Sequence, residues 1–312
     1  MATRTRSART PAVPPPNPRR RWRFIAAAVA AALVALASGA VYLTRGATKV
    51  TVDQAVRSYR AQAGTPAAPP RQAAPARRQA APAARTATAQ KTAAKTAETH
   101  AAPKTAPAAF AYPLSGVYSF ATQGYEETDA LNGQRHDYPK ETSLTIRRAG
   151  CGWISHWQPL NERWEDSEIC EHPQGSEMAH YTMYHEFFHR GQKEVFACPG
   201  GFVQRVGAKP GDSWTFDCAS DQSKGVSRTT FVGVDTVVVG GRSVRAAHMR
   251  YVITASGADS GTLEQDRWIS LGPQRAMVRM LQKASLRTKS PFGPVGYKES
   301  FRMDLKSLTP RT

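Results

Sequence analysis

Two groups of residues in this 312-residue chain have types and spacings that could support chemistry. The first is the run His185-Glu186-Phe187-Phe188-His189, which matches the H-E-x-x-H pattern of zinc hydrolases. In those enzymes a helix brings both imidazoles to one zinc ion, and the glutamate polarises the bound water. The second group is the four cysteines, which could form disulfides or bind a metal: Cys151, Cys170, Cys198 and Cys218.

The residues around the H-E-x-x-H match indicate a strand instead of a helix. Aromatic and polar side chains alternate from Ala179 to His189. On a strand, His185 and His189 lie about 13 Å apart at ~3.3 Å per residue and cannot share a metal ion. Val195 also occupies the position where a metzincin has its third histidine. We therefore predict no enzyme, no cofactor and no catalytic residue, and keep a zinc hydrolase using His185, Glu186 and His189 as the weaker alternative.

Other histidines do not form a recognisable catalytic set. His136, His156 and His172 lack a Gly-flanked Ser or Cys nucleophile in the sequence, so a triad is not indicated. We expect these histidines on the surface or in turns. The aromatic run Tyr181, Tyr184, Phe187 and Phe188 is expected in the core, or along a cavity.

The cysteines favour disulfides over a zinc site. No two of them have the C-x₂₋₄-C spacing of structural zinc sites. Four cysteines allow three pairings. If Cys151 faces Cys170 across a hairpin, then Trp157 faces Trp164 and both lie on the side of the disulfide. Cys198 and Cys218 then pair by elimination.

All of these residues fall in the last 203 positions, which must supply the folded core. Residues 1–109 contain only two acidic residues, no cysteine and four aromatic residues. Such a composition cannot bury enough apolar surface to offset the entropy of ordering the chain. We therefore predict one exported domain over residues 110–312.

The formal net charge of +18 does not indicate nucleic-acid binding, because of where the charge lies. A nucleic-acid-binding domain carries its basic residues on the fold itself. Here residues 110–312 have 24 basic and 22 acidic residues, a net of only +2. Within them, residues 110–223 carry −7 and residues 224–312 carry +9, so we expect the two halves to pair as neighbouring strands.

The N-terminal residues predict a membrane anchor. Residues 1–23 form a basic tail with seven arginines, and residues 24–44 contain an uncharged, mostly apolar run. About 20 apolar residues span the ~30 Å core of a bilayer, and the arginines keep the tail in the cytoplasm. The alternative is a signal peptide cleaved after Ala37, at Ala35-Leu36-Ala37. Either way, the remainder of the chain is exported.

Residues 45–109 are predicted to be a short juxtamembrane segment followed by a disordered linker. Residues 49–62 could form a short helix with Val52, Ala55, Val56 and Tyr59 on one face. From Gly64 to Ala109 the chain is rich in Ala, Pro, Thr and Lys. An extended linker of this length could hold the folded domain up to ~140 Å from the membrane at ~3.1 Å per residue.

Short alternating runs separated by turn residues predict an all-β domain. Gly116–Phe120, Ser143–Ile146, 225–232, 244–254, 262–270, 276–286 and 296–308 are expected strands. Gly240-Gly241 is a hairpin signal between two of them. About a dozen such strands favour a curved antiparallel sheet, a half-barrel or a barrel.

One segment resembles a known group of exported proteins. Its pattern is Val237-Val238-Val239-Gly240-Gly241, then Trp268-Ile269, Gly272-Pro273 and Met277-Val278-Arg279. This order is similar to the lipoprotein-carrier-like half-barrel superfamily, and the whole layout resembles uncharacterised envelope proteins of high-GC Gram-positive bacteria. The resemblance implies a curved sheet whose concave face holds an acyl chain, and it identifies no site residue.

The sequence therefore supports three hypotheses about function. The first is a structural or partner-binding domain of the cell envelope, with no catalytic activity. The second is a domain that binds a lipid or another apolar ligand, in a cavity flanked by Trp157 and Trp164 or by residues 181–188. The third and weakest is the zinc hydrolase.

Overall fold

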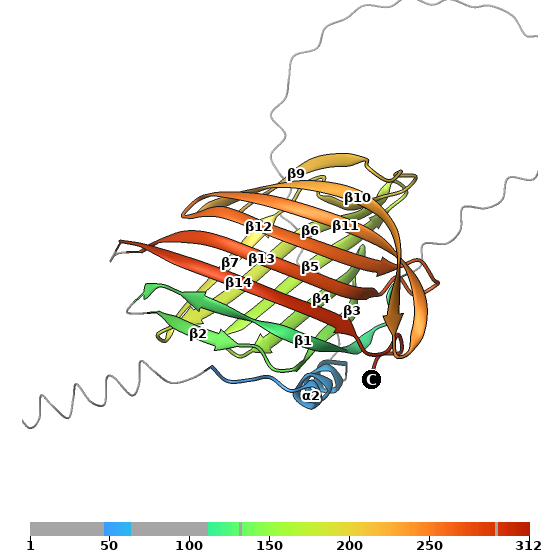
Figure 1. The fold of residues 1–312 in the computed structure, drawn as a ribbon, viewed down its shortest axis with the longest axis horizontal. Coiled ribbons are helices and arrows are strands. Elements are labelled where there is room, and N and C mark those ends of the chain that lie inside the picture. Colours follow the sequence, from blue (N-terminus) through green and yellow to red (C-terminus); the bar gives the residue numbers. More distant parts are fainter. Residues whose placement is uncertain (1–46, 64–111, 131–132, 291–292) are drawn as a thin grey trace, which may run out of the picture.

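The computed structural model describes residues 47–63, 112–130, 133–290 and 293–312 (Figure 1). The basic tail, the predicted span at 24–44 and nearly all of the predicted linker lie outside these residues. Within the described residues, no helix is long and apolar enough to cross a bilayer.

The described chain contains one helix followed by a long series of strands. The helix is α2 (Val52–Ala63), and the strands are β1 (Gly116–Thr128), β2 (Gln134–Asp137), β3 (Glu141–Ala149), β4 (Gly152–Leu160), β5 (Arg163–His172), β6 (Gly175–Phe187), β7 (Arg190–Ala197), β8 (Phe202–Arg205), β9 (Ser213–Ala219), β10 (Ser223–Val239), β11 (Arg242–Gly257), β12 (Asp259–Ser270), β13 (Met277–Ser290) and β14 (Gly293–Leu305).

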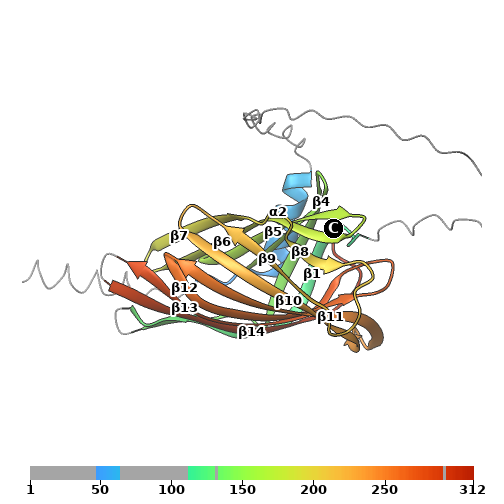
Figure 2. The same cartoon turned by 90° about the horizontal axis from the view of Figure 1, so that it is seen from above.

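Twelve of these strands close into an antiparallel barrel (Figures 1 and 2). Strand β14 pairs with β1, which completes the circle, while β2 and β8 add short pairings to β1 and β6. The all-β prediction is therefore confirmed, and the sheet is a closed barrel instead of a half-barrel. Inward and outward side chains alternate along the strands, as on β14, where Phe301, Met303 and Leu305 point inward while Arg302 points out.

The hairpin signal at Gly240-Gly241 is confirmed. Val239 faces Arg242 across the β10–β11 turn. Both glycines have positive φ angles, of 55° and 78°. A two-residue turn of this hand matches the twist of the flanking strands and strongly favours glycine.

The two oppositely charged halves of the domain do not pair strand by strand, which corrects the expectation from the sequence. Nearly every strand pairs with its neighbour in the chain, so strand order around the barrel follows sequence order. Within the described residues, strand pairing therefore joins the acidic and basic halves at the β1–β14 and β9–β10 boundaries.

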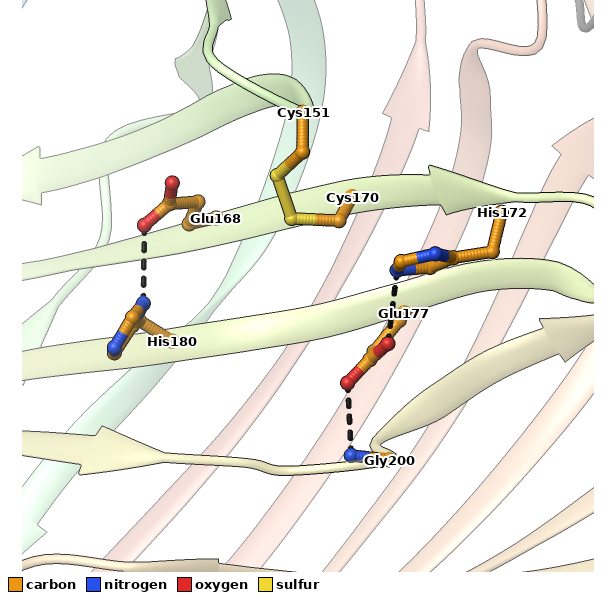
Figure 3. The surroundings of a disulfide bond; sticks show 7 residues. All are labelled: Cys151, Glu168, Cys170, His172, Glu177, His180 and Gly200. Atoms are coloured by element: carbon orange, nitrogen blue, oxygen red, sulfur yellow. Dashed lines mark hydrogen bonds and ion pairs between the residues drawn. A yellow bond between two sulfur atoms is a disulfide. The ribbon is translucent and has the colours of Figure 1, made fainter. Parts of the chain in front are cut away.

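Both predicted disulfides are present. Cys151 is bonded to Cys170, and Cys198 is bonded to Cys218. The first bridge ties the β3–β4 turn to β5, and Glu168 beside it accepts a hydrogen bond from His180 on β6 (Figure 3). The second joins the ends of β7 and β9, which pair through backbone only at Ala197 and Ala219. We call this weakly paired junction the β7–β9 seam.

The predicted register of the first hairpin is wrong by one residue. Gly152, not Cys151, faces Cys170, and Trp157 faces Glu165 instead of Trp164. A one-residue shift moves side chains to the opposite face of a strand. Trp157 is consequently buried in the core against Phe301, whereas Trp164 lies on the outer wall and stacks on Tyr184 at 5.5 Å.

The helix expected at 49–62 is present as α2 and packs against the outside of the barrel (Figure 1). Val52 and Val56 contact Val117 on β1. Before the helix, the backbone N–H of Val50 donates to Pro159 at 3.1 Å, and Lys49 bridges to Leu160. The packed structure therefore includes residues 47–63 in addition to the predicted domain at 110–312.

This contact changes the role expected of the linker. The chain touches the barrel on both sides of residues 64–111, at α2 and again from residue 112 onward. These residues therefore join two points on one packed body. The distance from the predicted span to the barrel is therefore set by the residues before Ala47, and the predicted linker itself lies outside the described residues.

Candidate binding site in the barrel interior

A buried guanidinium lies at the centre of a polar cluster inside the barrel. Arg163, at the start of β5, is 1% exposed. Its Nε donates to Glu299 Oε1 at 3.0 Å, and its Nη2 donates to Glu165 Oε2 at 3.0 Å. Tyr138 and Tyr181 donate to Glu299 and Glu165 respectively. A buried charge is tolerated only when it is paired and hydrogen-bonded in this way.

A third carboxylate, Glu126 on β1, extends the cluster toward two histidines. It is fully buried, and its Oε2 lies 4.0 Å from Arg163 Nε. His136 donates to Glu126 Oε1 at 2.9 Å, and His185 donates to Oε2 at 3.2 Å. Tyr297 donates to Oε2 as well, at 3.2 Å. Three carboxylates thus surround one guanidinium. We call Glu126, Arg163, Glu165 and Glu299 with their partners the charge cluster.

The cluster shifts the pKa values of its members in opposite directions. Burial alone would raise the pKa of Glu126, but hydrogen bonds from His136 and His185, with the charges of His185 and Arg163, hold it at about 2. Burial opposes the charged form of Arg163, yet Glu299 and Glu165 raise its pKa above its ordinary value. Burial also raises the pKa of Tyr138, Tyr181 and Tyr297, which keeps these phenols as donors.

Acid should therefore destabilise the barrel through Glu126. Its pKa is about 2 in the folded chain against an ordinary 4.5. A lowered pKa contributes stability above pH 4.5 that is lost as pH falls toward 2, here up to about 3 kcal/mol. Urea unfolding between pH 5.5 and 2.5 should show this slope, and Glu126→Gln should flatten it. Glu127→Gln, on the outward side of β1, should keep it, and equal slopes in all three proteins would contradict this role.

The H-E-x-x-H residues do not converge on one point. His185 and Glu186 are consecutive on β6 and point to opposite faces, so His185 reaches Glu126 inside while Glu186 accepts from Tyr184 outside at 2.7 Å. Phe188 and His189 are not part of the strand, because both have positive φ angles in the β6–β7 turn. Among the described residues, no group of three His, Cys, Asp or Glu side chains could hold a metal ion.

The other residues that the sequence analysis singled out lie partly inside the barrel and partly on its outer wall. His136 corrects the expectation of a surface position, since it is 4% exposed and stacks on Phe187. His156 is half-buried beside Asp166, and His172 lies near a turn where it pairs with Glu177 (Figure 3). Of the aromatic run, Tyr181 points into the barrel, whereas Tyr184 is on the outer wall.

Two cavities occupy the barrel interior beside the charge cluster. One, of about 100 Å³, is lined by Trp153, Trp157, Met280 and Met303 among others, and we call it the tryptophan cavity. The other, of about 120 Å³, has a mostly apolar lining and is called the apolar cavity. Its apolar residues are Met178, Tyr181, Met183, Val203, Phe196, Phe216, Ile253, Ala255, Leu263 and Leu286.

The two cavities are neighbours, because Val203, Tyr251 and Arg267 line both. The apolar cavity also lies against the β7–β9 seam, since Phe196 and Cys218 form part of its wall. Each volume is near the ~150 Å³ of an engineered apolar cavity that takes up benzene. They are well below the ~300–1,000 Å³ of sites for drug-sized ligands.

Sequence reasoning named His136, Tyr181 and His185 but missed the four charged residues at the centre of the charge cluster. A signal was available, because Glu299 lies between Tyr297 and Phe301 in an alternating run and therefore shares their inward face. The same alternation places Glu126 inward on β1. Charged residues at inward positions of several strands indicate a buried polar cluster.

Comparisons with known proteins identify no family for this chain. No protein-family model matches it, and no curated protein sequence matches it. Among solved structures, it is similar to the hypothetical lipoprotein YmcC from Escherichia coli (K12), with a TM-score of 0.28 and 14% sequence identity. That match covers 62% of this chain and 85% of the other. A similarity of this size supports no conclusion about function.

Proposed function

We propose that the barrel is a non-catalytic binding domain of the cell envelope, whose ligand is a slim apolar molecule held in the interior. The observation that carries this proposal is the apolar cavity, which lies inside a closed barrel and against its weakest junction. Apolar cavities of this kind stay dry and take up apolar molecules. The acyl-binding role implied by the resemblance to lipoprotein carriers agrees with it and remains a prediction.

The size of the cavity limits the ligand. About 120 Å³ accommodates one narrow chain or one small ring, not a two-chain lipid. Each buried methylene adds about 0.8 kcal/mol, or roughly fourfold in affinity. We expect the affinity for linear alcohols to rise with chain length until the cavity is full, and then to level off.

Methionine NMR can test this proposal in the full chain. Met178 and Met183 line the apolar cavity, so ¹³C-methyl signals from both should shift saturably when 1-octanol is added to the protein in amphipol. Ala255→Phe, which fills the cavity, should abolish the shifts. Thr254→Phe, whose side chain points out from the same strand, should leave them unchanged. Absence of saturable shifts in the wild type would overturn the proposal.

We further propose that the barrel lies close to the membrane, with the N-terminus in the cytoplasm and the barrel outside. If residues 24–44 span the bilayer, only Arg45 and Gly46 separate the span from the docked segment that begins at Ala47. Three peptide steps cover at most about 11 Å. The cleaved alternative, after Ala37, would instead release the barrel.

Energy transfer to the bilayer tests this arrangement. A dye at Asn161→Cys, in the β4–β5 turn beside the docked segment, should transfer energy efficiently to labelled lipid headgroups in reconstituted vesicles. Val56→Asp, which undocks α2, should reduce the transfer, whereas Arg57→Asp on the exposed face of α2 should not. Transfer that depends on the length of residues 64–111 would contradict this placement.

A partner-binding role remains the second candidate, and exposed valines favour it. Val226, Val232, Val234 and Val238 on β10, with Val252 on β11, are each 38–62% exposed. Apolar side chains gathered on one wall are typical of interaction surfaces. Crosslinking in intact cells from a cysteine at Val234 should capture a partner if this role is correct.

A further inference from the structure

Several buried polar atoms at the cavities have no hydrogen-bond partner within the described part of the chain. Those that line a cavity include Arg267 Nε and Ser227 Oγ, and Thr229 Oγ1 lies two residues along the strand from Ser227. Ser227 is 2% exposed and lines the apolar cavity, and Arg267 lines both cavities. An unsatisfied buried polar group costs about 1–3 kcal/mol, so such groups call for an explanation. A ligand that accepts hydrogen bonds would satisfy them.

Arg267 differs from the other interior guanidinium in its pairing. Arg163 has carboxylate oxygens at 3.0 Å on two sides. Arg267 has no ion pair within 4.0 Å among the side chains that the structure describes. Its guanidinium lies over the ring of Tyr251, 5.5 Å from the centroid. Glu165 attracts it through space but is hydrogen-bonded to Arg163 and Tyr181.

The position of Arg267 fixes how a ligand would be oriented. It faces inward from β12 and lines both cavities, while Leu286 of the apolar cavity pairs with Gly261, six residues away from Arg267 along β12. A molecule with its apolar chain in that cavity would place its polar end at Arg267, with Ser227 on the wall of the same cavity. Arginine binds planar carboxylates through two parallel hydrogen bonds.

From these contacts we propose that the interior site takes a single-chain carboxylate, a medium-chain fatty acid, with its head on Arg267 and Ser227 and its tail in the apolar cavity. This inference rests on the proposed binding function. The charge of one carboxylate balances the Arg267 guanidinium, which has no ion pair among the described side chains. The cavity volume of about 120 Å³ excludes two chains or a bulky head group.

The test compares octanoate with 1-octanol, which have chains of equal length and differ in the head group. Both are titrated at pH 7.5 into the full chain in amphipol, with the methyl signals of Met178 and Met183 as the readout. Octanoate should bind at least tenfold more tightly than 1-octanol. Arg267→Met should weaken octanoate about 10- to 100-fold and leave 1-octanol nearly unchanged. Retained 1-octanol binding also shows that the variant is folded.

Two further variants complete the experiment. Ser227→Ala should weaken octanoate by about two- to tenfold. Arg228→Met removes a guanidinium on the outward side of β10, next to Ser227, and should change neither affinity. Equal binding of the two ligands, or selectivity that survives Arg267→Met, overturns the fatty-acid inference while the binding function stands. Failure of both ligands to bind the wild type overturns the proposed function itself.

Discussion

Replacing Arg163 with methionine should destabilise the barrel by about 3–5 kcal/mol, which is a large part of the stability of a typical domain. Methionine fills similar space but leaves Glu126, Glu165 and Glu299 buried without their shared cation. Urea unfolding at pH 7 should show a lower midpoint with an unchanged slope. Arg190→Met, at the exposed start of β7, should change stability by less than about 0.5 kcal/mol.

The pH dependence of stability gives an independent test of the Arg163→Met prediction. In the wild type, Arg163 helps to lower the pKa of Glu126 and of Glu165, so falling pH removes stability. Without the guanidinium, burial raises the pKa of these carboxyls, and protonation then becomes favourable in the folded state. The stability difference between the two proteins should therefore shrink between pH 7 and pH 4. A difference that stays constant would mean that the loss comes from packing alone.

Removing the Cys198–Cys218 disulfide should open the β7–β9 seam. Replacing both cysteines with alanine should cost about 3 kcal/mol, because the bond closes a loop with a sequence separation of 20. The two strands should also separate locally at the seam, more readily than the loss of unfolding free energy indicates. The reason is that Ala197 and Ala219 form the only backbone pair between the two strands in the described residues. Hydrogen exchange should therefore accelerate on β9 and on Phe196.

The other disulfide is a matched control for this experiment. Cys151 and Cys170 are separated by 19 residues, so the loop-entropy model gives nearly the same loss of stability. However, β4 and β5 pair along most of their length, and their amides should stay protected when both cysteines become alanine. Equal local exchange in the two double variants would show that the seam does not depend on its disulfide.

Much of the fold follows from alternation in the sequence, but register does not. Inward and outward positions predict strands at nearly all the expected places, and the pairing of cysteines follows from hairpin geometry. The first hairpin was nevertheless displaced by one residue, because Cys151 lies in the β3–β4 turn and Gly152 takes the position opposite Cys170, and a bulge between Trp157 and Leu160 adds a further shift near the β4–β5 turn. A bulge depends on tertiary contacts and leaves little trace in composition.

The interior site was harder to predict than the sheet. His136 is buried because β2 pairs with β1 and brings it opposite Glu126, a contact set by the loop between them. The docking of α2 could likewise not be predicted without the barrel surface, since a helix of 12 residues has little stability alone. Arg267 and Ser227 are 40 residues apart in the sequence and become neighbours of one cavity only when the barrel closes.

The most direct test of interior binding is to locate a ligand chain by anomalous diffraction. Crystals of the full chain grown with 8-bromo-1-octanol should give a bromine peak inside the barrel, among Met183, Phe196 and Leu286 of the apolar cavity. The uncharged head group makes this result independent of Arg267. Bromine found only on the outer wall, with the interior unchanged, would contradict the claim that this barrel binds apolar molecules in its core.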